Sequence, residues 1–296
     1  MALSAYFNKI RSEVEGALDR LVPKIGAYPP VIHESMRYSL FAGGKRLRPM
    51  LALAACDCVG GERKSALAFA CAIEIIHTYT LIHDDLPAID NDDMRRGKPT
   101  NHKKFGEATA ILAGDGLLTL AFEIMTGSPQ ADGASAQTLL EVTAQTARAA
   151  GSTGTVGGQV ADIASEGCEP DGALLEYIHS HKTGKLITAS VKGGAMIGGA
   201  QDDQLRALTD YGKHIGLAFQ IVDDILDIEG DEKKLGKNLR SDIKKEKMTY
   251  PSVAGMEESK KRAVELSGIA VESLEMFGSS ARHLKDLAMY ITTRTF

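Results

Sequence analysis

Two clusters of acidic residues in this 296-residue sequence have the type and spacing to do chemistry: Asp84, Asp85 and Asp90 in the first, and Asp223, Asp224 and Asp227 in the second. Each cluster lies among apolar residues, where gathering like charges costs on the order of several kcal/mol unless cations neutralise them. Carboxylates presented a few at a time suit Mg²⁺, which typically connects one or two carboxylates to substrate phosphates. The clusters therefore predict a site that binds a polyphosphorylated substrate through magnesium.

The two clusters differ in their expected backbone. Asp223 and Asp227 are four residues apart and Gln220 precedes Asp223 by three, so a helix would present all three on one side. Asp84 and Asp90 are six apart with a proline between them, which interrupts helical hydrogen bonding. We therefore expect the chain to bend after Asp84 and return Asp90 toward it. The alternative is a set of surface acids at helix ends, which two clusters after long apolar segments disfavour.

Cationic residues occur in groups along the chain, and diphosphate binding needs such donors. The groups are Gly43-Gly44-Lys45-Arg46-Leu47-Arg48-Pro49, Arg95-Arg96-Gly97-Lys98, His181-Lys182-Thr183-Gly184-Lys185, and Lys237 with Lys247. Each group alone is more often solvated surface, but beside the acidic clusters the groups favour binding of two separate anions. His77 precedes Asp84 by seven residues, two turns along the same face, so it is either a packed neutral histidine or a substrate contact.

The elements that must position these residues are helical. Apolar residues recur every three or four positions, as at Ile215, Phe219, Val222 and Leu226, and the alternation typical of strands is nearly absent. We predict an all-α fold with a single domain over residues 1–296 and roughly ten or more helices. The expected helices are 2–21, 31–42, 48–59, 63–86, 106–126, 134–150, 156–165, 172–198, 202–229, 251–277 and 281–293.

Composition excludes several classes of function. The net charge is −5 and there is no basic tail, so nucleic acid is not an expected partner. The four cysteines lie in apolar stretches without zinc-site spacing, which predicts buried free thiols in a reducing compartment. No signal peptide is evident, and no uncharged apolar stretch reaches the length of a membrane span. We expect a cytoplasmic protein without stable membrane insertion that can still enclose an apolar substrate tail.

Three stretches, Gly43–Pro49, Leu81–Thr100 and Phe219–Asp227, resemble the motifs of the trans-isoprenyl diphosphate synthases, or polyprenyl synthetases. The resemblance extends over nearly the whole chain, and the first acidic motif looks like that of bacterial farnesyl diphosphate synthases. It implies an all-α fold around a deep central cavity and a homodimer. It also implies Mg²⁺-dependent condensation of isopentenyl diphosphate with dimethylallyl or geranyl diphosphate, giving farnesyl diphosphate and diphosphate.

The resemblance also implies a role for each matching residue. The residues that would bind Mg²⁺ are Asp84, Asp90 and Asp223. The resemblance implies three ions per active site, for which Mn²⁺ can substitute. The acidic shells would be completed by Asp85, Asp224 and Asp227. Lys45, Arg48, His77 and Arg96, with Gly44 beside them, match the isopentenyl diphosphate site. Arg95, Lys182, Thr183, Gln220 and Lys237 match the allylic site. Arg240 and Glu246 stand where the family often carries glycines, which leaves the roles of Lys237 and Lys247 open.

The chemistry fits these residues. Magnesium and cationic side chains would neutralise the diphosphate as it leaves the allylic carbon. Thr183 and Gln220 offer oxygen dipoles that steady the allylic cation without attacking it. The isopentenyl double bond then attacks, and the released diphosphate takes the final proton, because no side-chain base stands out.

Product length is the finer prediction. Tyr79 and Thr80 precede Asp84 by five and four residues, about one helical turn deeper. A tyrosine there would block the growing tail and favour a C15 product, whereas the alternative is ordinary core packing. The rival functions are a geranylgeranyl or geranyl diphosphate synthase, a terpene cyclase, which needs no second diphosphate site, and a non-catalytic binding subunit, which would have eroded acidic motifs.

Overall fold

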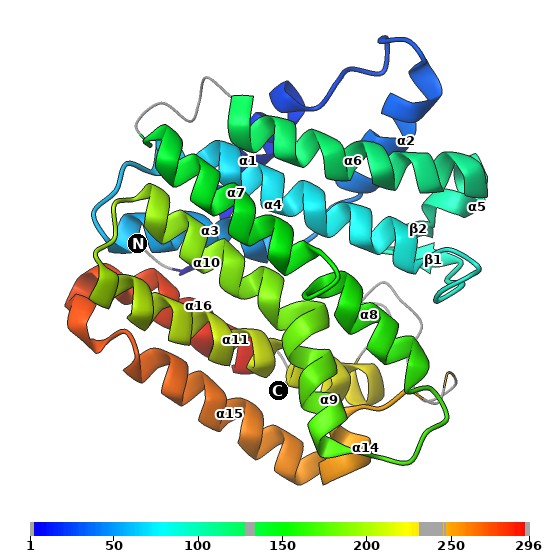
Figure 1. Ribbon diagram of the computed structural model, residues 1–296. Helices are drawn as coiled ribbons and strands as arrows, with labels where there is room; N and C mark the ends of the chain where they lie inside the picture. The colour runs from blue at the N-terminus through cyan, green and yellow to red at the C-terminus, as the bar shows by residue number, and fades with distance from the viewer. Residues whose placement is uncertain (1–2, 128–133, 231–244, 246, 294–296) are drawn as a thin grey trace. The chain divides into compact units, whose positions relative to one another are not determined.

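The computed structural model describes residues 3–127, 134–230, 245 and 247–293, and these are overwhelmingly helical, which confirms the predicted fold class (Figure 1). In the described part of the chain, β-structure is confined to a two-stranded hairpin. Contacts divide the chain into two compact units, residues 1–50, 67–132 and 232–238 in the first and 51–66, 133–231 and 239–296 in the second. The prediction of one domain over 1–296 stays a prediction.

The first unit contains the first acidic cluster. Its elements are α1 (Leu3–Leu21), α2 (Pro30–Leu40), most of α4 (Arg63–Asp84), β1 (Met94–Arg95), β2 (Lys98–Pro99), α5 (Asn101–Phe105) and α6 (Glu107–Gly127). Helices α2, α5 and α6 pack on one another. The isoleucines of α4, among them Ile73, Ile75 and Ile76, are fully buried, so this helix is apolar all round and forms the core of the unit.

Helices α4 and α6 are each long and apolar enough to cross a membrane by length and composition alone. Charged residues lie within both helices, Glu74 in α4 and Asp115 and Glu123 in α6. In α4, 83% of the apolar window is buried inside the protein, whereas in α6 only 39% is buried. Ile111 and Leu112 of α6 are 44% and 58% exposed, so this helix presents apolar side chains at the surface of the part of the chain that the structure describes.

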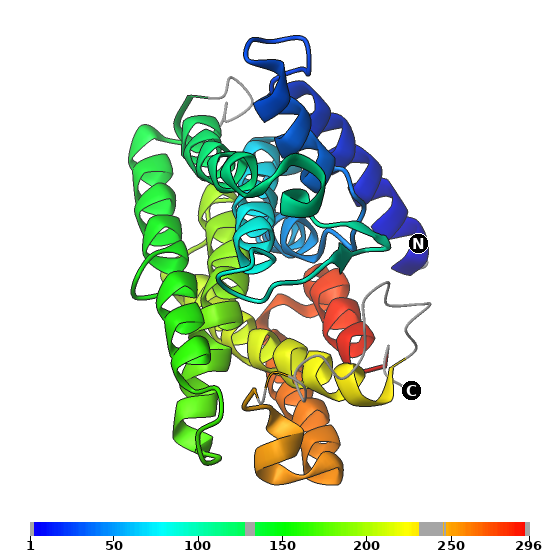
Figure 2. The same ribbon diagram turned by 90° about the vertical axis from the view of Figure 1, so that its right-hand side faces the viewer.

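The second unit contains the second acidic cluster. Its elements are the larger part of α3 (Leu47–Cys58), then α7 (Ala136–Ala150), α8 (Thr155–Ala164), α9 (Gly172–Ile178), the π-helical turn η2 (His179–Gly184), α10 (Lys185–Ile197), α11 (Asp202–Glu229), α14 (Tyr250–Ala254), α15 (Met256–Glu272), the 3₁₀ turn η3 (Glu275–Ala281) and α16 (Arg282–Thr293). Helix α11 packs against α10, α15 and α16 (Figure 2). This long helix therefore forms the centre of the unit and carries Gln220 and the second acidic cluster.

The predicted helices differ from the structure in four places. The predicted helix 251–277 is three elements, because Gly255 takes a positive φ of 82° between α14 and α15 and η3 follows as a 3₁₀ turn. The predicted helix 172–198 contains the π-helical turn η2, which apolar periodicity does not reveal. Helix α5 and the hairpin were not predicted, and the helix expected over 63–86 ends at Asp84.

The cysteine prediction holds for all but one residue. Cys56, Cys58 and Cys71 are buried free thiols, whereas Cys168 is exposed in the segment before α9, because its neighbours there are polar. Burial raises the pKa of Cys56 to about 11 and that of Cys58 to about 12. These two thiols are therefore protonated and unreactive near neutral pH.

Candidate active site

The first acidic cluster lies on a tight turn at the end of α4. The Asp90 N–H donates to the Asp84 carbonyl at 2.8 Å, and the Asn91 N–H donates to the Leu86 carbonyl at 3.0 Å. The proline after Leu86 helps to end the helix, because it cannot donate a backbone hydrogen bond. The chain thus returns Asp90 to Asp84, as predicted, and both side chains stay partly accessible to solvent.

Asp85 has a different environment from its neighbour Asp84. It is 3% exposed, and the Arg95 Nε donates to its two carboxylate oxygens at 2.7 and 2.9 Å. Burial raises the pKa of Asp85, although the hydrogen bonds from Arg95 oppose the rise. The hairpin β1–β2 positions Arg95 by pairing it with Lys98. Asp85 therefore anchors the hairpin, and the assignment of Arg95 to an allylic diphosphate stays a prediction.

The loop Gly43–Arg48, which we call the cationic loop, adopts the left-handed backbone its glycines permit. The φ angles are 95° at Gly43 and 129° at Gly44. A Cβ on Gly44 would lie 2.8 Å from the guanidinium carbon of Arg96, so a side chain there would displace Arg96 and strain the backbone. Arg96 Nη1 also donates to the Gly43 carbonyl. The loop and Arg96 are therefore packed together, with Lys45 exposed and Arg48 8% exposed.

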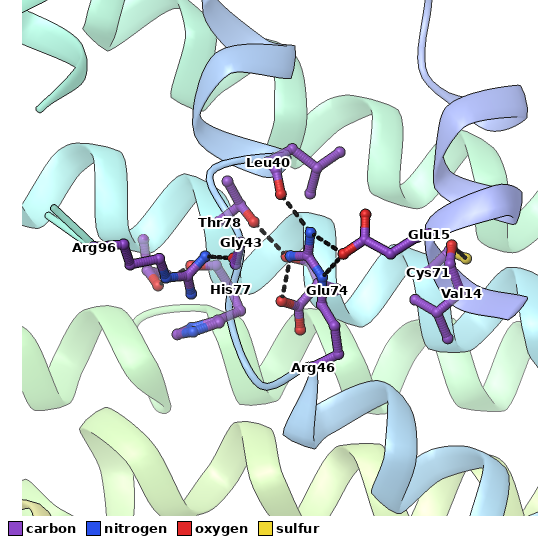
Figure 3. A network of polar contacts seen from close by, with 11 residues as sticks. Val14, Glu15, Leu40, Gly43, Arg46, Cys71, Glu74, His77, Thr78 and Arg96 are labelled. Atoms are coloured by element: carbon purple, nitrogen blue, oxygen red, sulfur yellow. Dashed lines mark hydrogen bonds and ion pairs between the residues drawn. The ribbon is translucent and has the colours of Figure 1, made fainter. Parts of the chain in front are cut away.

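His77 of α4 lies beside the cationic loop and Arg96, which together we call the cationic surface (Figure 3). Burial lowers the pKa of His77 well below its ordinary value, and the charges of Arg48, Arg96, Arg95 and Arg46 lower it further. A neutral imidazole among several cations can accept or donate a hydrogen bond without adding to the repulsion. The predicted residues Gly44, Lys45, Arg48, His77 and Arg96 all belong to this unit, and the structure links Arg96 to the loop and both Arg48 and Arg96 to His77.

Arg46 was assigned no role from the sequence, yet it is the largest fully buried side chain of the described residues (Figure 3). Its Nε and Nη1 reach Glu15 Oε1 and Glu74 Oε1, both at 2.8 Å. Its Nη2 donates to the Leu40 carbonyl at 2.6 Å. Its φ of 52° is left-handed, which costs a non-glycine residue about 1–2 kcal/mol. The ion pairs therefore hold a backbone conformation that arginine does not favour by itself.

Tyr79 and Thr80 lie one turn before the acidic turn. Tyr79 is 6% exposed, and its ring meets that of His83 edge-on, with centroids 5.7 Å apart. His83 Nε2 lies 3.0 Å from the Ile111 carbonyl of α6 and donates to it, since a carbonyl only accepts. Thr80 Oγ1 donates to the His77 carbonyl at 2.8 Å. The ring of Tyr79 thus packs against His83, which is bonded to α6, about one turn before Asp84.

In the second unit, the π-helical turn η2 carries Lys182 and Thr183. A Cβ on Gly158 of α8 would lie 2.1 Å from the Lys182 backbone nitrogen, so α8 approaches this turn as closely as glycine allows. Helix α11 packs on the same turn. Single π turns inside α-helices are frequent at functional sites because the wider turn redirects side chains. Here the turn lies between the helices that carry Asp162 and Gln220.

A hydrogen-bonded chain connects the predicted residues Thr183, Gln220 and Asp224. Gln220 Nε2 donates to Asp224 Oδ1 at 3.0 Å, and Thr183 Oγ1 donates to Gln220 Oε1 at 2.7 Å. A carboxylate only accepts, so Asp224 fixes the orientation of the Gln220 amide. The Tyr250 N–H and His179 Nε2 also reach Asp224 Oδ2, at 2.8 and 3.2 Å. Asp224 is 3% exposed, and both of its carboxylate oxygens have partners.

Lys182 is paired with a residue that the sequence interpretation missed. Asp162 of α8 accepts from Lys182 Nζ at 2.6 Å and lies 3.6 Å from Lys247 Nζ. These three residues line one pocket together with Thr183 and Gln220. Lys182 and Lys247 thus meet at the same carboxylate in this pocket. Lys237, Arg240 and Glu246 lie outside the described residues. His179 was also missed. Gln159 and Asp162 are three residues apart, so a helix presents both on one face, and this spacing is the feature of the sequence that could have pointed to Asp162.

The accessible carboxylates of the two acidic clusters fit a magnesium site. Asp84 and Asp90 share one turn and Asp223 is half-buried, whereas Asp227 is 1% exposed. Among the residues described, no three His, Cys, Asp or Glu side chains gather into a metal cluster. Mg²⁺ is normally held by one or two carboxylates, with substrate phosphates and water completing its six ligands. A turn with two accessible carboxylates therefore suits Mg²⁺ better than it suits a metal that needs a complete set of protein ligands.

Comparison with known proteins gives a consistent result. Residues 29–276 match the model of the family described as polyprenyl synthetase. The chain is 46% identical to the farnesyl diphosphate synthase of Geobacillus stearothermophilus, over 97% of each protein. It is 47% identical to the geranylgeranyl diphosphate synthase of Cyanophora paradoxa, over 99% of this chain and 96% of that protein. The fold matches a geranyltransferase from Helicobacter pylori complexed with magnesium and isoprenyl diphosphate, with a TM-score of 0.85 and 28% identity over 99% and 97% of the two chains.

Proposed function

Because this chain belongs to the polyprenyl synthetase family of prenyltransferases, we propose that it condenses isopentenyl diphosphate with dimethylallyl or geranyl diphosphate to give farnesyl diphosphate and diphosphate. The observation that carries the proposal is the cationic surface around Gly44, Arg96 and the neutral His77. A terpene cyclase binds one diphosphate and has no use for this second site. Both acidic clusters are complete, which a binding subunit would not require.

Isopentenyl diphosphate is the ligand we propose for this cationic surface. Lys45 is exposed and Arg48 and Arg96 adjoin the loop, so three cations are available to a doubly phosphorylated group. Guanidinium groups bind phosphate oxygens in pairs, which fixes the direction of the molecule as well as its position. Holding the double bond of isopentenyl diphosphate in one orientation is the main contribution of these residues to the rate.

The second-unit pocket is our candidate for the allylic diphosphate. Lys182 supplies positive charge where the diphosphate leaves, and Asp162 fixes the lysine side chain before substrate arrives. The Thr183 hydroxyl oxygen and the Gln220 carbonyl oxygen present negative dipole ends that stabilise a developing allylic cation. Asp224 orients this pair through the amide of Gln220. The leaving diphosphate is the proposed acceptor of the final proton.

Magnesium is the metal we propose, held by Asp84 and Asp90 on the first acidic turn and by Asp223 of α11. When bound, the ions would neutralise the diphosphate as its charge develops. The oxygen-only donor set supports this assignment, and the matched geranyltransferase contains magnesium with an isoprenyl diphosphate. The number of ions, three per site, and substitution by Mn²⁺ are part of the same proposal.

A C15 product is the chain length we propose, although relatives named both farnesyl and geranylgeranyl diphosphate synthases match this chain. The supporting observation is Tyr79, which is 6% exposed and braced by His83 one turn before Asp84. A rigid aromatic ring there limits the length of an apolar tail extending from a diphosphate at Asp84. A geranylgeranyl product is the alternative.

The assembly we propose is a homodimer in the cytoplasm. The apolar side chains that α6 presents at the surface, Ile111 and Leu112, support association with a second copy. Light scattering on the purified protein should give twice the 31.6 kDa of one chain.

The test of the proposed function is a product analysis. The purified protein is incubated with Mg²⁺, isopentenyl diphosphate and, in separate reactions, dimethylallyl, geranyl or farnesyl diphosphate. We expect a C15 product from the first two starters and little reaction with the third. Cyclic hydrocarbons formed without isopentenyl diphosphate would instead identify a cyclase, and a C20 product would correct the chain length alone.

A further inference from the structure

We propose that Arg46, together with Glu15 and Glu74, is a positioning residue that holds the cationic loop in the shape that binds isopentenyl diphosphate. The inference rests on the proposed function, since that function supplies the ligand. We call Arg46, Glu15 and Glu74 the buried ion triad (Figure 3). None of the three residues belongs to the acidic clusters or to the predicted substrate contacts.

Arg46 is fully buried, unlike the residues next to it in the sequence. Its side chain is 0% exposed and each of its guanidinium nitrogens has a hydrogen-bond partner inside the protein, so the guanidinium does not reach a ligand at the surface. Lys45, immediately before it, is exposed. The alternation of an exposed lysine with a fully buried arginine depends on the left-handed φ of 52° at Arg46. Arg46 therefore acts on a ligand through its neighbours rather than by contact.

The backbone of Arg46 connects the glycines of the cationic loop to α3. Its carbonyl accepts from the Met50 N–H at 3.1 Å, so Arg46 immediately precedes the first turn of α3, which carries Arg48. A change in the backbone at Arg46 would move Lys45 on one side and Arg48 on the other. It would also move Gly43, whose carbonyl accepts from Arg96. One buried side chain thus controls three cations of the surface.

The triad contributes charge as well as geometry. Arg46 with two glutamates has a formal charge of −1, placed under a surface that carries Lys45, Arg48 and Arg96. Burial lowers the pKa of Arg96, whereas the charge of Glu74 opposes that change. Glu74 is 2% exposed, so water screens its effect little. The negative triad reduces repulsion among the cations before a diphosphate is present.

The test uses Arg46→Lys, Arg46→Met and Glu15→Gln in the full-length protein. Lysine keeps the charge but loses the planar fork, so it cannot reach Glu15, Glu74 and the Leu40 carbonyl together. We expect the KM for isopentenyl diphosphate to rise at least tenfold in both Arg46 variants. The KM for geranyl diphosphate should stay within twofold and kcat within threefold. Equilibrium dialysis with labelled isopentenyl diphosphate should show weaker binding by a similar factor.

A matched control separates positioning from general stability. Arg37 of α2 also forms an ion pair with α1, through Asp19, and donates to the Val22 carbonyl, so these partners lie in or just after α1 rather than in the cationic loop. Arg37→Met should lower the melting temperature without a selective rise in the KM for isopentenyl diphosphate. The Arg46 variants should show that selective rise at temperatures well below their own melting temperature.

Two outcomes would overturn the inference: an unchanged KM for isopentenyl diphosphate in a folded Arg46 variant, or equal increases in KM for both substrates. If the Arg46 variants do not fold, Glu15→Gln decides, because Glu15 is 30% exposed and the substitution keeps its shape. It should raise the KM for isopentenyl diphosphate about threefold, and no change would overturn the inference. Failure of the wild-type protein to condense the substrates would refute the proposed function instead.

Discussion

Six aspartates in the two acidic clusters occupy two kinds of environment. Asp84, Asp90 and Asp223 are partly accessible, whereas Asp85, Asp224 and Asp227 are 3%, 3% and 1% exposed. Asp85 is bound to Arg95, and Asp224 accepts from Gln220 and a backbone N–H. The three accessible aspartates are the residues that the resemblance implied as magnesium ligands. Of the buried group, Asp85 and Asp224 orient the neighbouring side chains of Arg95 and Gln220.

Substitution of an accessible aspartate should therefore affect turnover rather than folding. We expect Asp84→Ala or Asp223→Ala to lower kcat by about 100-fold or more, since removing one group that stabilises developing charge costs about 100- to 1000-fold. Circular dichroism and melting temperature should stay close to wild type. Asp210→Ala is a matched control on α11, because Asp210 is exposed and pairs with Lys213. Near-normal turnover of either cluster variant with Mg²⁺ present would refute the assignment.

His77 predicts a pH dependence of stability. Its pKa is lowered in the folded protein by burial and by Arg48, Arg96, Arg95 and Arg46, whereas an unfolded histidine titrates near pH 6.5. Below about pH 6.5 the unfolded state therefore binds a proton that the folded state does not, and stability falls. Relative to wild type, His77→Gln should gain about 1 kcal/mol in free energy of unfolding between pH 7.5 and 5.5. Parallel urea denaturation curves at both pH values measure this, and a constant difference would contradict it.

Tyr79 carries the prediction on product length. Tyr79→Ala removes the buried ring beside His83 and should shift the main product from C15 toward C20 or longer. Thr80→Ala is the neighbouring control, since the Thr80 hydroxyl is already bonded to the His77 carbonyl and its removal leaves the ring in place. Chromatography of the dephosphorylated products gives the distribution. An unchanged product from Tyr79→Ala would place the limit on tail length elsewhere.

At the scale of elements, the close approach of α8 to the π-helical turn positions the second-unit pocket. A methyl group on Gly158 would lie 2.1 Å from the Lys182 backbone nitrogen, so Gly158→Ala must displace one of the two elements. We expect the free energy of unfolding to fall by about 1–3 kcal/mol and the KM for the allylic substrate to rise.

Gly268→Ala is the matched control for this substitution. Gly268 is an exposed glycine of α15, and a Cβ added there would meet no atom within 4 Å, so alanine should stabilise the protein by about 0.5–1 kcal/mol. Chemical denaturation of both variants measures the two changes. Equal stability of Gly158→Ala and wild type would contradict the close-approach argument.

Periodicity was sufficient to predict the helical class and most helices, because long amphipathic or apolar helices such as α4 and α11 repeat the same pattern over many residues. It missed the π turn and the break at Gly255, since a local change of backbone leaves the apolar spacing intact. Spacing also predicted the bend that returns Asp90 to Asp84. It could not reveal that Asp162 binds Lys182 or that Arg46 is buried between Glu15 and Glu74, because these contacts join residues 20 or more positions apart.

At the scale of the whole molecule, each compact unit supplies a distinct part of the proposed chemistry. The first contains the cationic loop, His77 and the turn of Asp84 and Asp90, and the second contains the pocket of Lys182, Thr183 and Gln220. Residues 29–276, which match the polyprenyl synthetase family, include both acidic clusters and the cationic loop. The relatives of this chain include both a farnesyl and a geranylgeranyl diphosphate synthase.

The most direct measurement is the stoichiometry of diphosphate release with both substrates, with each substrate alone, and with Mg²⁺ removed by a chelator. We expect one diphosphate to be released for each isopentenyl diphosphate consumed and none when either substrate is missing. Chelation should stop the release, and added Mg²⁺ should restore it. Release from the allylic diphosphate alone at the full rate, or condensation that continues without a divalent cation, would contradict this expectation.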